Sequence, residues 1–355
     1  KKYDFEPMMW SDMFFRLANH GGYYVKDPEI ITEDIVKCVP ENVELVYWDY
    51  YNTKKEFYNN VVEGIRAKLG DEYMVDVREV IKVNLTLDGL TIHHDSENIT
   101  PTIYLNNYKE HFDSGRPLED IIQEIISVYQ SHRNPEHIMV HDFYDFDNLK
   151  DKIIIKVIGT DKNERLLKNI PHLIMGDLGL AVIPYVMLQS DEQGNMGFQI
   201  QHNHLKLWNK TLTEIIELAT ANTNRMYNFV VKNMNEILFE SFGMDVLGCN
   251  TDIELQNFDN PMYVLTDSGN KTLGASQLYL KDKIKEFADI CECSLYILPS
   301  SIHELILIRE DFAGICVEEL KQMVQSVNAT EVSDEDFLSD NLYFYNKETE
   351  EISKL

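Results

Sequence analysis

The sequence predicts an α+β fold of mixed, mostly antiparallel strands with packed helices. Apolar residues repeat at helical spacing in some segments and alternate with polar residues in others, and several alternating segments come in pairs separated by polar turns. The order of these segments shows hairpins rather than a regular strand-helix alternation. With 355 residues, 44% of them hydrophobic, the chain can bury the core of one large or two ordinary domains.

The N-terminal half of this fold begins with a helix and a hairpin. The helix is expected where apolar residues recur at helical spacing up to Gly70, namely Phe57, Val61, Ile65 and Leu69. Residues 73–84 and 87–94 alternate around Asp88 and Gly89, which predicts a hairpin turning at that pair. A short strand and helical turn should follow, and then a helix from Pro117 with one apolar face, formed by Leu118, Ile121, Ile122, Ile125, Val128 and Tyr129.

The C-terminal half continues the mixture of strands and helices. Residues 152–159 are β-branched and strand-like, and residues 178–188 should pair with 197–202 in a second hairpin. Thr211 and Glu214 have capping-box spacing ahead of a helix. Strands are then expected near 261, 295, 304 and 342, and helices near 280 and 317.

Charge and cysteine usage exclude several classes of protein. The net charge of -28 and the pI near 4.7 oppose binding to nucleic acid or to anionic membranes. No apolar stretch is long enough to span a bilayer. Five scattered cysteines do not form a disulfide framework, so we expect a reducing, cytoplasmic location.

Two stretches near the N-terminus set a tryptophan beside an aspartate. "PMMWSDMFF" contains Trp10 and "VELVYWDYY" contains Trp48, each at the end of an apolar run. These stretches resemble two strand ends in the barrel of glycoside hydrolase family 20, the β-N-acetylhexosaminidases. The resemblance implies that residues 1–60 are a β-α-β-like fragment of a TIM barrel, in which Trp10 and Trp48 would stack on a sugar.

This hydrolase resemblance is incomplete. The resemblance implies a catalytic Asp-Glu pair upstream of the first tryptophan, and no adjacent Asp-Glu pair precedes Trp10 here. We therefore expect no catalytic residue in this fragment and no hexosaminidase activity. Turnover of a chromogenic N-acetylglucosaminide that is lost in Trp10→Ala or Trp48→Ala would overturn this expectation.

The rest of the chain resembles a different family. "GLTIHHDSENITPTIYLN", "HNHLKLWNKTLTEIIELA" and "LYILPSSIHELILI" are among the stretches, in order from about residue 62 onward, that are similar to an uncharacterised bacterial family, the domain of unknown function numbered 5688. The expected domains are therefore residues 1–60 and residues 61–355, the latter divisible into 61–250 and 251–355. Residues 61–355 should fold alone, and the join near residue 60 is either a natural fusion or an artefact of gene prediction.

Three polar clusters are candidates for functional sites. The histidines of "HNH", His202 and His204, lack the partners of a metal site, and a polar cap between strand and helix fits them better. "LPSSIHE" (298–304) lacks the surroundings of a serine nucleophile and is typical of a hairpin turn. The aspartates of residues 141–151 lack calcium-loop spacing, so carboxylates near a helix start are the better interpretation.

No complete catalytic or metal constellation therefore stands out in the sequence. We expect an intracellular binding or interaction protein without metal or cofactor, whose acidic surface favours a protein or a small cationic partner. The alternative is an enzyme, either an unrecognised hydrolase within residues 61–355 or a remnant of the hexosaminidase.

Overall fold

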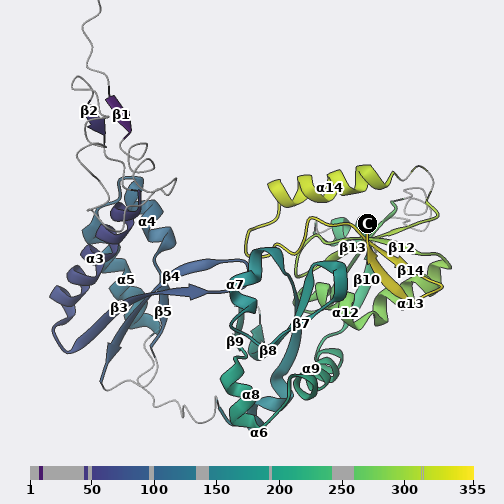
Figure 1. The fold of residues 1–355 in the computed structure, drawn as a ribbon, viewed down its shortest axis with the longest axis horizontal. Helices are drawn as coiled ribbons and strands as arrows, with labels where there is room; N and C mark the ends of the chain where they lie inside the picture. Colours follow the sequence, from purple (N-terminus) through teal and green to yellow (C-terminus); the bar gives the residue numbers. More distant parts are fainter. Residues whose placement is uncertain are drawn as a thin grey trace, which may run out of the picture. The chain divides into compact units, whose positions relative to one another are not determined.

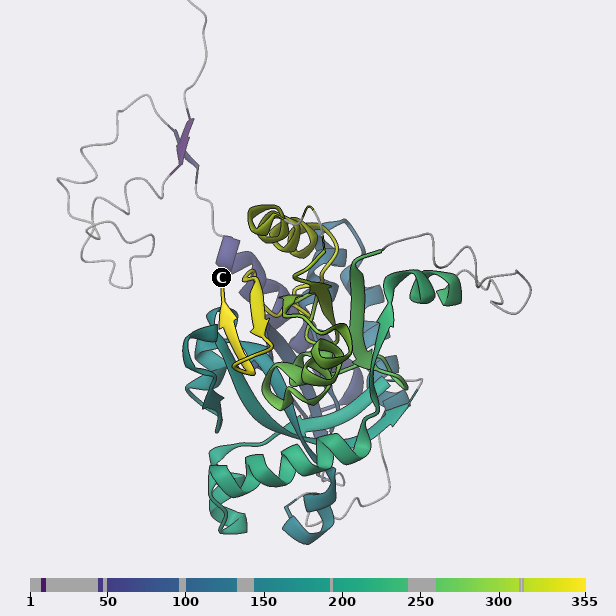
Figure 2. The same ribbon diagram turned by 90° about the vertical axis from the view of Figure 1, so that its right-hand side faces the viewer.

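The structure is a computed structural model, and it describes residues 8–10, 44–46, 50–95, 100–132, 144–191, 194–241, 260–312, 314 and 316–355. Its contacts divide the chain into two compact units: unit 1 holds residues 1–78 and 88–133, and unit 2 holds residues 79–87 and 134–355. Both units combine helices with mostly antiparallel strands (Figure 1 and Figure 2). The predicted α+β class is confirmed.

Unit 1 is built on a three-stranded sheet in the order β3-β4-β5. Its strands are β3 (Tyr73–Ile81), β4 (Thr86–His94) and β5 (Thr102–Tyr104), and its helices are α3 (Tyr50–Leu69), α4 (Asn106–Asp113) and α5 (Leu118–His132). Two further strands, β1 (Met8–Trp10) and β2 (Glu44–Val46), form a separate parallel pair. A parallel pair of three-residue strands is too little to identify a barrel fragment.

The core of unit 1 lies between α3, α5 and the sheet. Phe57, Val61 and Ile65 are at most 1% exposed, as helical spacing requires, and α3 ends before Gly70, whose φ of +103° favours glycine. The predicted helix is thus confirmed. The predicted domain boundary at residue 60 falls inside α3, with Phe57 on one side of it and Val61 on the other.

The first hairpin is confirmed, but its predicted turn at Asp88 and Gly89 is wrong. Those two residues lie within β4, where Asp88 accepts a hydrogen bond from the Tyr58 hydroxyl at 2.7 Å. The chain turns instead at residues 82–85, closed by Lys82 N donating to Leu85 O. Asn84 supplies the left-handed conformation, with φ of 62°.

The described residues of unit 2 form two sheets, and the first is centred on one long strand. β8 (Leu180–Asp191) pairs with β6 (Ile153–Gly159) on one side and with β7 (Leu173–Ile174) and β9 (Gly194–Gln199) on the other. The predicted second hairpin is confirmed as β8 and β9. The helices of this part are α6 (Phe146–Leu149), η3 (Lys150–Lys152), η4 (Asp161–Asn163), α7 (Glu164–Leu167), η5 (Gly176–Leu178), α8 (His202–Trp208) and α9 (Leu212–Met226).

The second sheet of unit 2 has six strands in the order β10-β11-β13-β12-β14-β15. They are β10 (Phe229–Asn233), β11 (Met262–Asp267), β12 (Leu295–Leu298), β13 (Leu305–Arg309), β14 (Tyr343–Asn346) and β15 (Glu351–Lys354). The accompanying helices are α10 (Met234–Ser241), η7 (Gly274–Ser276), α12 (Gln277–Leu280), α13 (Asp282–Cys291) and α14 (Val317–Thr330). β14 and β15 run side by side to the C-terminus (Figure 2).

One hydrophobic core joins both sheets of unit 2. It includes Ile155 of β6 and Ile215 of α9 together with Leu265 of β11 and Leu295 of β12, all of them fully buried. The expected division of this region at residue 250 therefore crosses a shared core. Whether residues 61–250 and 251–355 fold separately stays a prediction.

The capping box of α9 is confirmed. Thr211 N donates to Glu214 Oε2 at 2.8 Å, and Glu214 N donates to Thr211 Oγ1 at 3.3 Å. The backbone and hydroxyl of Thr211, followed by Lys210, lower the pKa of Glu214 to about 2.

This lowered pKa makes the cap sensitive to acid. A depressed carboxyl pKa stabilises the fold above the ordinary value near 4.3, and the contribution is lost as pH falls toward about 2. We expect carbon NMR titration to give Glu214 a pKa well below the ordinary range in the wild type. In Thr211→Ala the value should move back toward that range, and an unchanged value would contradict the assignment to the cap.

Candidate functional site

A cavity of about 410 Å³ opens in unit 2 where β8, α9, β10 and β11 meet. Its apolar lining is Met187 and Leu188 from β8 and Met226 from the end of α9. Its polar lining comes from two short segments: Tyr227 and Asn228, and then Asp267, Ser268, Gly269 and Asn270. A concave site that joins an apolar wall to a few convergent polar groups is the usual form of a small-molecule site.

The chain reaches this position because α9 gives way directly to β10. The last turn of α9 is closed by Tyr227 N donating to Thr223 O at 3.1 Å, and Tyr227 itself is extended, with φ of -115° and ψ of 137°. Antiparallel pairing then sets Phe229 opposite Asp267. The start of β10 and the end of β11 therefore lie together at the cavity.

The Asp267 carboxylate is the main electrostatic feature of the cavity. Asp267 is 5% exposed, and its Oδ1 accepts from Asn228 N at 2.9 Å, while Oδ2 accepts from Gly269 N at 3.0 Å and Asn270 N at 2.9 Å. These hydrogen bonds satisfy the oxygens of the buried carboxylate and also hold the turn after β11. Oδ1 takes one of these bonds and has capacity for another donor.

Tyr227 lies in the electrostatic field of Asp267. Burial, and then the negative charge of Asp267, raise the pKa of Tyr227 to about 12, so its hydroxyl is neutral at pH 7. The Tyr227 ring stacks on Phe229 with ring centroids 6.1 Å apart, which fixes its orientation. The described residues that line the cavity include no lysine, arginine or histidine, so its charge is negative.

The "LPSSIHE" segment is the turn between β12 and β13, as predicted. Ser301 Oγ accepts from His303 N at 3.0 Å and from Glu304 N at 3.2 Å, and Ser300 Oγ donates to Glu304 Oε1 at 3.2 Å. Both serines therefore have roles within the turn. His303 O accepts from Gly274 N and from Thr266 Oγ1, which ties the turn to its neighbours.

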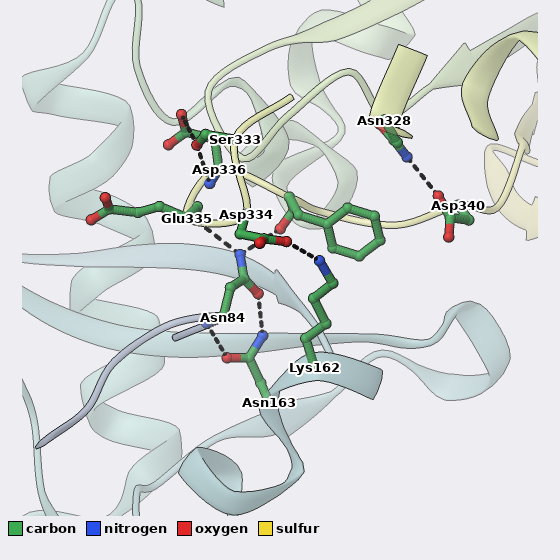
Figure 3. Close-up of polar contacts among 10 residues, drawn as sticks. Asn84, Lys162, Asn163, Asn328, Ser333, Asp334, Glu335, Asp336 and Asp340 are labelled. Carbon is green, nitrogen blue, oxygen red and sulfur yellow. Dashed lines mark hydrogen bonds and ion pairs between the residues drawn. The ribbon is translucent and has the colours of Figure 1, made fainter. Parts of the chain in front are cut away.

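His303 contacts a carboxylate, but no serine that the structure describes donates a hydrogen bond to its ring, so this contact does not activate a serine. Its Nε2 lies 3.1 Å from Asp336 Oδ1, and Ser333 Oγ donates to Asp336 Oδ2 at 2.9 Å (Figure 3 shows Ser333 beside Asp336). The carboxylate thus stands between serine and imidazole, whereas a nucleophilic serine must donate to the base itself. The other ring nitrogen, His303 Nδ1, is buried without a hydrogen-bond partner among the described residues.

The "HNH" segment starts α8 and caps it. His204 Nδ1 accepts from Gln201 N at 2.9 Å, and its ring stacks on Trp208 at 5.3 Å. Burial lowers the pKa of His204. The interpretation as a polar helix cap is confirmed, and no group of three or more potential metal ligands occurs within the described ranges.

The remaining candidates are the aspartates of residues 141–151 and the two tryptophans, and only some of them lie within the described residues. Asp145 caps α6 by accepting from Asp147 N at 3.0 Å, and Asp147 pairs with Lys150, so this part of the acidic stretch lies at a helix start as predicted. Asp142 lies outside the described residues. Trp10 ends β1, its side chain is not described, and Trp48 lies outside the described residues. Their role as sugar contacts stays a prediction.

Sequence reasoning missed Asp267 and Asn84. "TDSGN" (266–270) carries a turn signal, but nothing in it shows that the aspartate faces a cavity. Asn84 Nδ2 donates to Glu335 O at 2.9 Å and Phe337 O at 2.7 Å, and Asn163 Nδ2 donates to Asn84 Oδ1 at 2.7 Å (Figure 3). An asparagine between two predicted strands is typical of a turn position with positive φ, and this pattern could have pointed to Asn84.

Comparison with protein families identifies the larger part of the chain. The model of a family described as "Family of unknown function (DUF5688)" matches residues 54–347. The chain belongs to this family. The DUF5688 match begins in α3 and ends after β14, so it includes the first sheet of unit 2, the second sheet without β15, and the cavity at Asp267.

The other comparisons add no named relative. Neither the curated proteins nor the solved structures contain a match to this chain. The family comparison gives no support to the glycoside hydrolase resemblance of residues 1–60. Among the helices that the structure describes, none has the length and hydropathy needed to cross a bilayer.

Proposed function

We propose that this DUF5688 protein is a binding protein whose cavity at Asp267 takes a small organic cation, such as a primary amine. The observation that carries the proposal is a cavity of about 410 Å³ in which the buried Asp267 carboxylate is the one charged group among the described lining residues. An ammonium group would donate to Asp267 Oδ1, and the apolar part of the ligand would lie on Met187, Leu188 and Met226.

The rest of the chain supports a cationic ligand. The net charge of -28 raises the local concentration of cations and speeds their arrival. The free cysteines Cys291, Cys293 and Cys316 support a cytoplasmic location for this binding role. The hydrolase alternative would require Trp10 and Trp48, whose side chains the structure does not describe, and we do not propose it.

A thermal-shift screen tests the proposal. Phenethylamine should raise the melting temperature in a saturable way, because a ligand at 100 times its Kd adds about 2.7 kcal/mol of stability. Phenylethanol, which has the same shape without the charge, should give a smaller shift, and phenylacetate should give none. Equal shifts for the amine and the alcohol would contradict the role of Asp267.

Tyr227→Phe separates the hydroxyl from the ring. The hydroxyl makes no hydrogen bond to another described residue, whereas the ring packs on Phe229, so the variant should melt close to the wild type. Because Tyr227 lines the cavity, loss of one hydrogen bond to the ligand, worth about 0.5–1.5 kcal/mol, should weaken amine binding roughly 2- to 12-fold. Unchanged amine affinity in Tyr227→Phe would remove this residue from the site.

A further inference from the structure

A second cavity of unit 2 is lined by a lysine, whereas the cavity at Asp267 is lined by a carboxylate. It measures about 310 Å³ and lies beside the edge strand β7, against α12 and β15. Its wall is apolar: Leu173, Ile174, Met175, Leu178, Leu278 and Ile352. Leu173 and Ile174 are 41% and 50% exposed, so water meets part of this wall.

Lys281 is the one charged residue among the described residues that line this cavity. Its Nζ donates to a backbone carbonyl, Glu350 O, at 3.3 Å, and no carboxylate of the described residues lies within ion-pair distance of it. The neighbouring Lys285 differs, because it pairs with the carboxylates of Glu350 and Asp289. The charge of Lys281 is therefore unmatched at the rim of an apolar cavity, on a protein that is otherwise strongly acidic.

The backbone of Lys281 is also unusual. Lys281 joins α12 to α13 with φ of 66° and ψ of -11°, a left-handed conformation that favours glycine. Its N donates to Gln277 O at 2.8 Å and its O accepts from Lys285 N at 2.8 Å, so two helix ends hold it there. This fixed backbone sets the point from which the Lys281 side chain extends beside the apolar wall.

We propose that this cavity binds a small amphipathic carboxylate, with its alkyl or aryl part on the apolar wall and its carboxylate paired with Lys281 Nζ. The apolar wall supplies burial, and the ammonium selects the charge of the head group. This site is separate from the cavity at Asp267 and has the opposite preference for charge. No bond is made or broken in this binding.

Calorimetric titration of the full protein with octanoate, octanol and octylamine tests the proposal. The three probes share an alkyl chain and differ in the charge of the head group. Octanoate should bind in a saturable way and more tightly than octanol, and octylamine should bind most weakly to this site. Absence of saturable octanoate binding, or equal affinity for octanoate and octanol, would refute the proposal.

Lys281→Gly distinguishes a lost contact from a damaged fold. Glycine suits the left-handed backbone, so this variant should melt at or above the wild-type temperature. It should nonetheless lose roughly tenfold in octanoate affinity, while octanol affinity stays the same. Lys281→Arg should retain octanoate binding.

Two further variants complete the test. Ile174→Glu adds a negative charge to a half-exposed position of the wall. It should weaken the binding of octanoate more than the binding of octanol. Met226→Lys, at the other cavity, should leave octanoate binding unchanged. Wild-type octanoate affinity in both Lys281→Gly and Ile174→Glu would place the carboxylate elsewhere and overturn the assignment.

Discussion

Deletion of residues 1–60 is expected to unfold unit 1, against the expectation from the sequence that residues 61–355 fold alone, whereas deletion of residues 1–49 should leave it folded. The longer deletion removes Phe57, which is 1% exposed and packs on Phe112 with ring centroids 5.0 Å apart, and it removes the Tyr58 hydrogen bond to Asp88. Loss of a buried phenylalanine alone costs about 3–5 kcal/mol. The total should approach the whole stability of an ordinary domain, about 5–15 kcal/mol.

The shorter deletion removes only β1, β2 and the residues around them. Within the described structure these two strands pair with each other and not with the sheet β3-β4-β5. Hydrogen exchange of the α5 segment, residues 118–132, should therefore stay protected after deletion of 1–49 and lose protection after deletion of 1–60. Equal protection in both truncated proteins would show that the first half of α3 is dispensable.

Asn84→Ala is expected to destabilise unit 2 by about 2–4 kcal/mol, because each of its three side-chain hydrogen bonds contributes about 0.5–1.5 kcal/mol. The alanine also has to keep φ near 62°. Asn84→Gly loses the same hydrogen bonds without that strain, so it should be about 1 kcal/mol more stable than Asn84→Ala. Urea unfolding of the full chain measures both differences.

Asn169→Ala is the matched control for this comparison. Asn169 is exposed, and its amide donates only to Arg165 O, at 2.8 Å, on the same helical segment. Its loss should change stability by less than about 0.5 kcal/mol. An Asn84→Ala protein as stable as the Asn169→Ala protein would mean that the hairpin tip contributes little to unit 2.

The regular elements of this fold could be predicted because their signals are local. The helical spacing of Phe57, Val61 and Ile65 and the capping box of Thr211 and Glu214 both lie within one or two turns. The first hairpin was found but its turn was misplaced, since Asp-Gly is a strong turn pair, yet Asp88 is held in β4 by Tyr58, thirty residues away.

The cavity at Asp267 could not be predicted from the sequence. Its lining comes from segments at 187–188, 226–228 and 267–270, and only the pairing of β10 with β11 and the end of α9 bring them together. The conformation of Lys281 could not be predicted either, because lysine rarely adopts the left-handed backbone conformation that it has here. The polar clusters that did stand out in the sequence are mainly turns and caps in the structure.

The central claim is that the cavity at Asp267 selects a cation, and calorimetric titration of two Met226 variants tests it most directly. Met226 lines the cavity and is 41% exposed, so both substitutions should be tolerated. Met226→Lys places an ammonium beside Asp267 and should weaken the binding of phenethylamine at least about tenfold. The affinity for phenylethanol should stay the same. Met226→Gln, of similar length and without charge, should bind the amine nearly as the wild type does. Equal phenethylamine affinity in the Lys and Gln variants would contradict a cation site at Asp267.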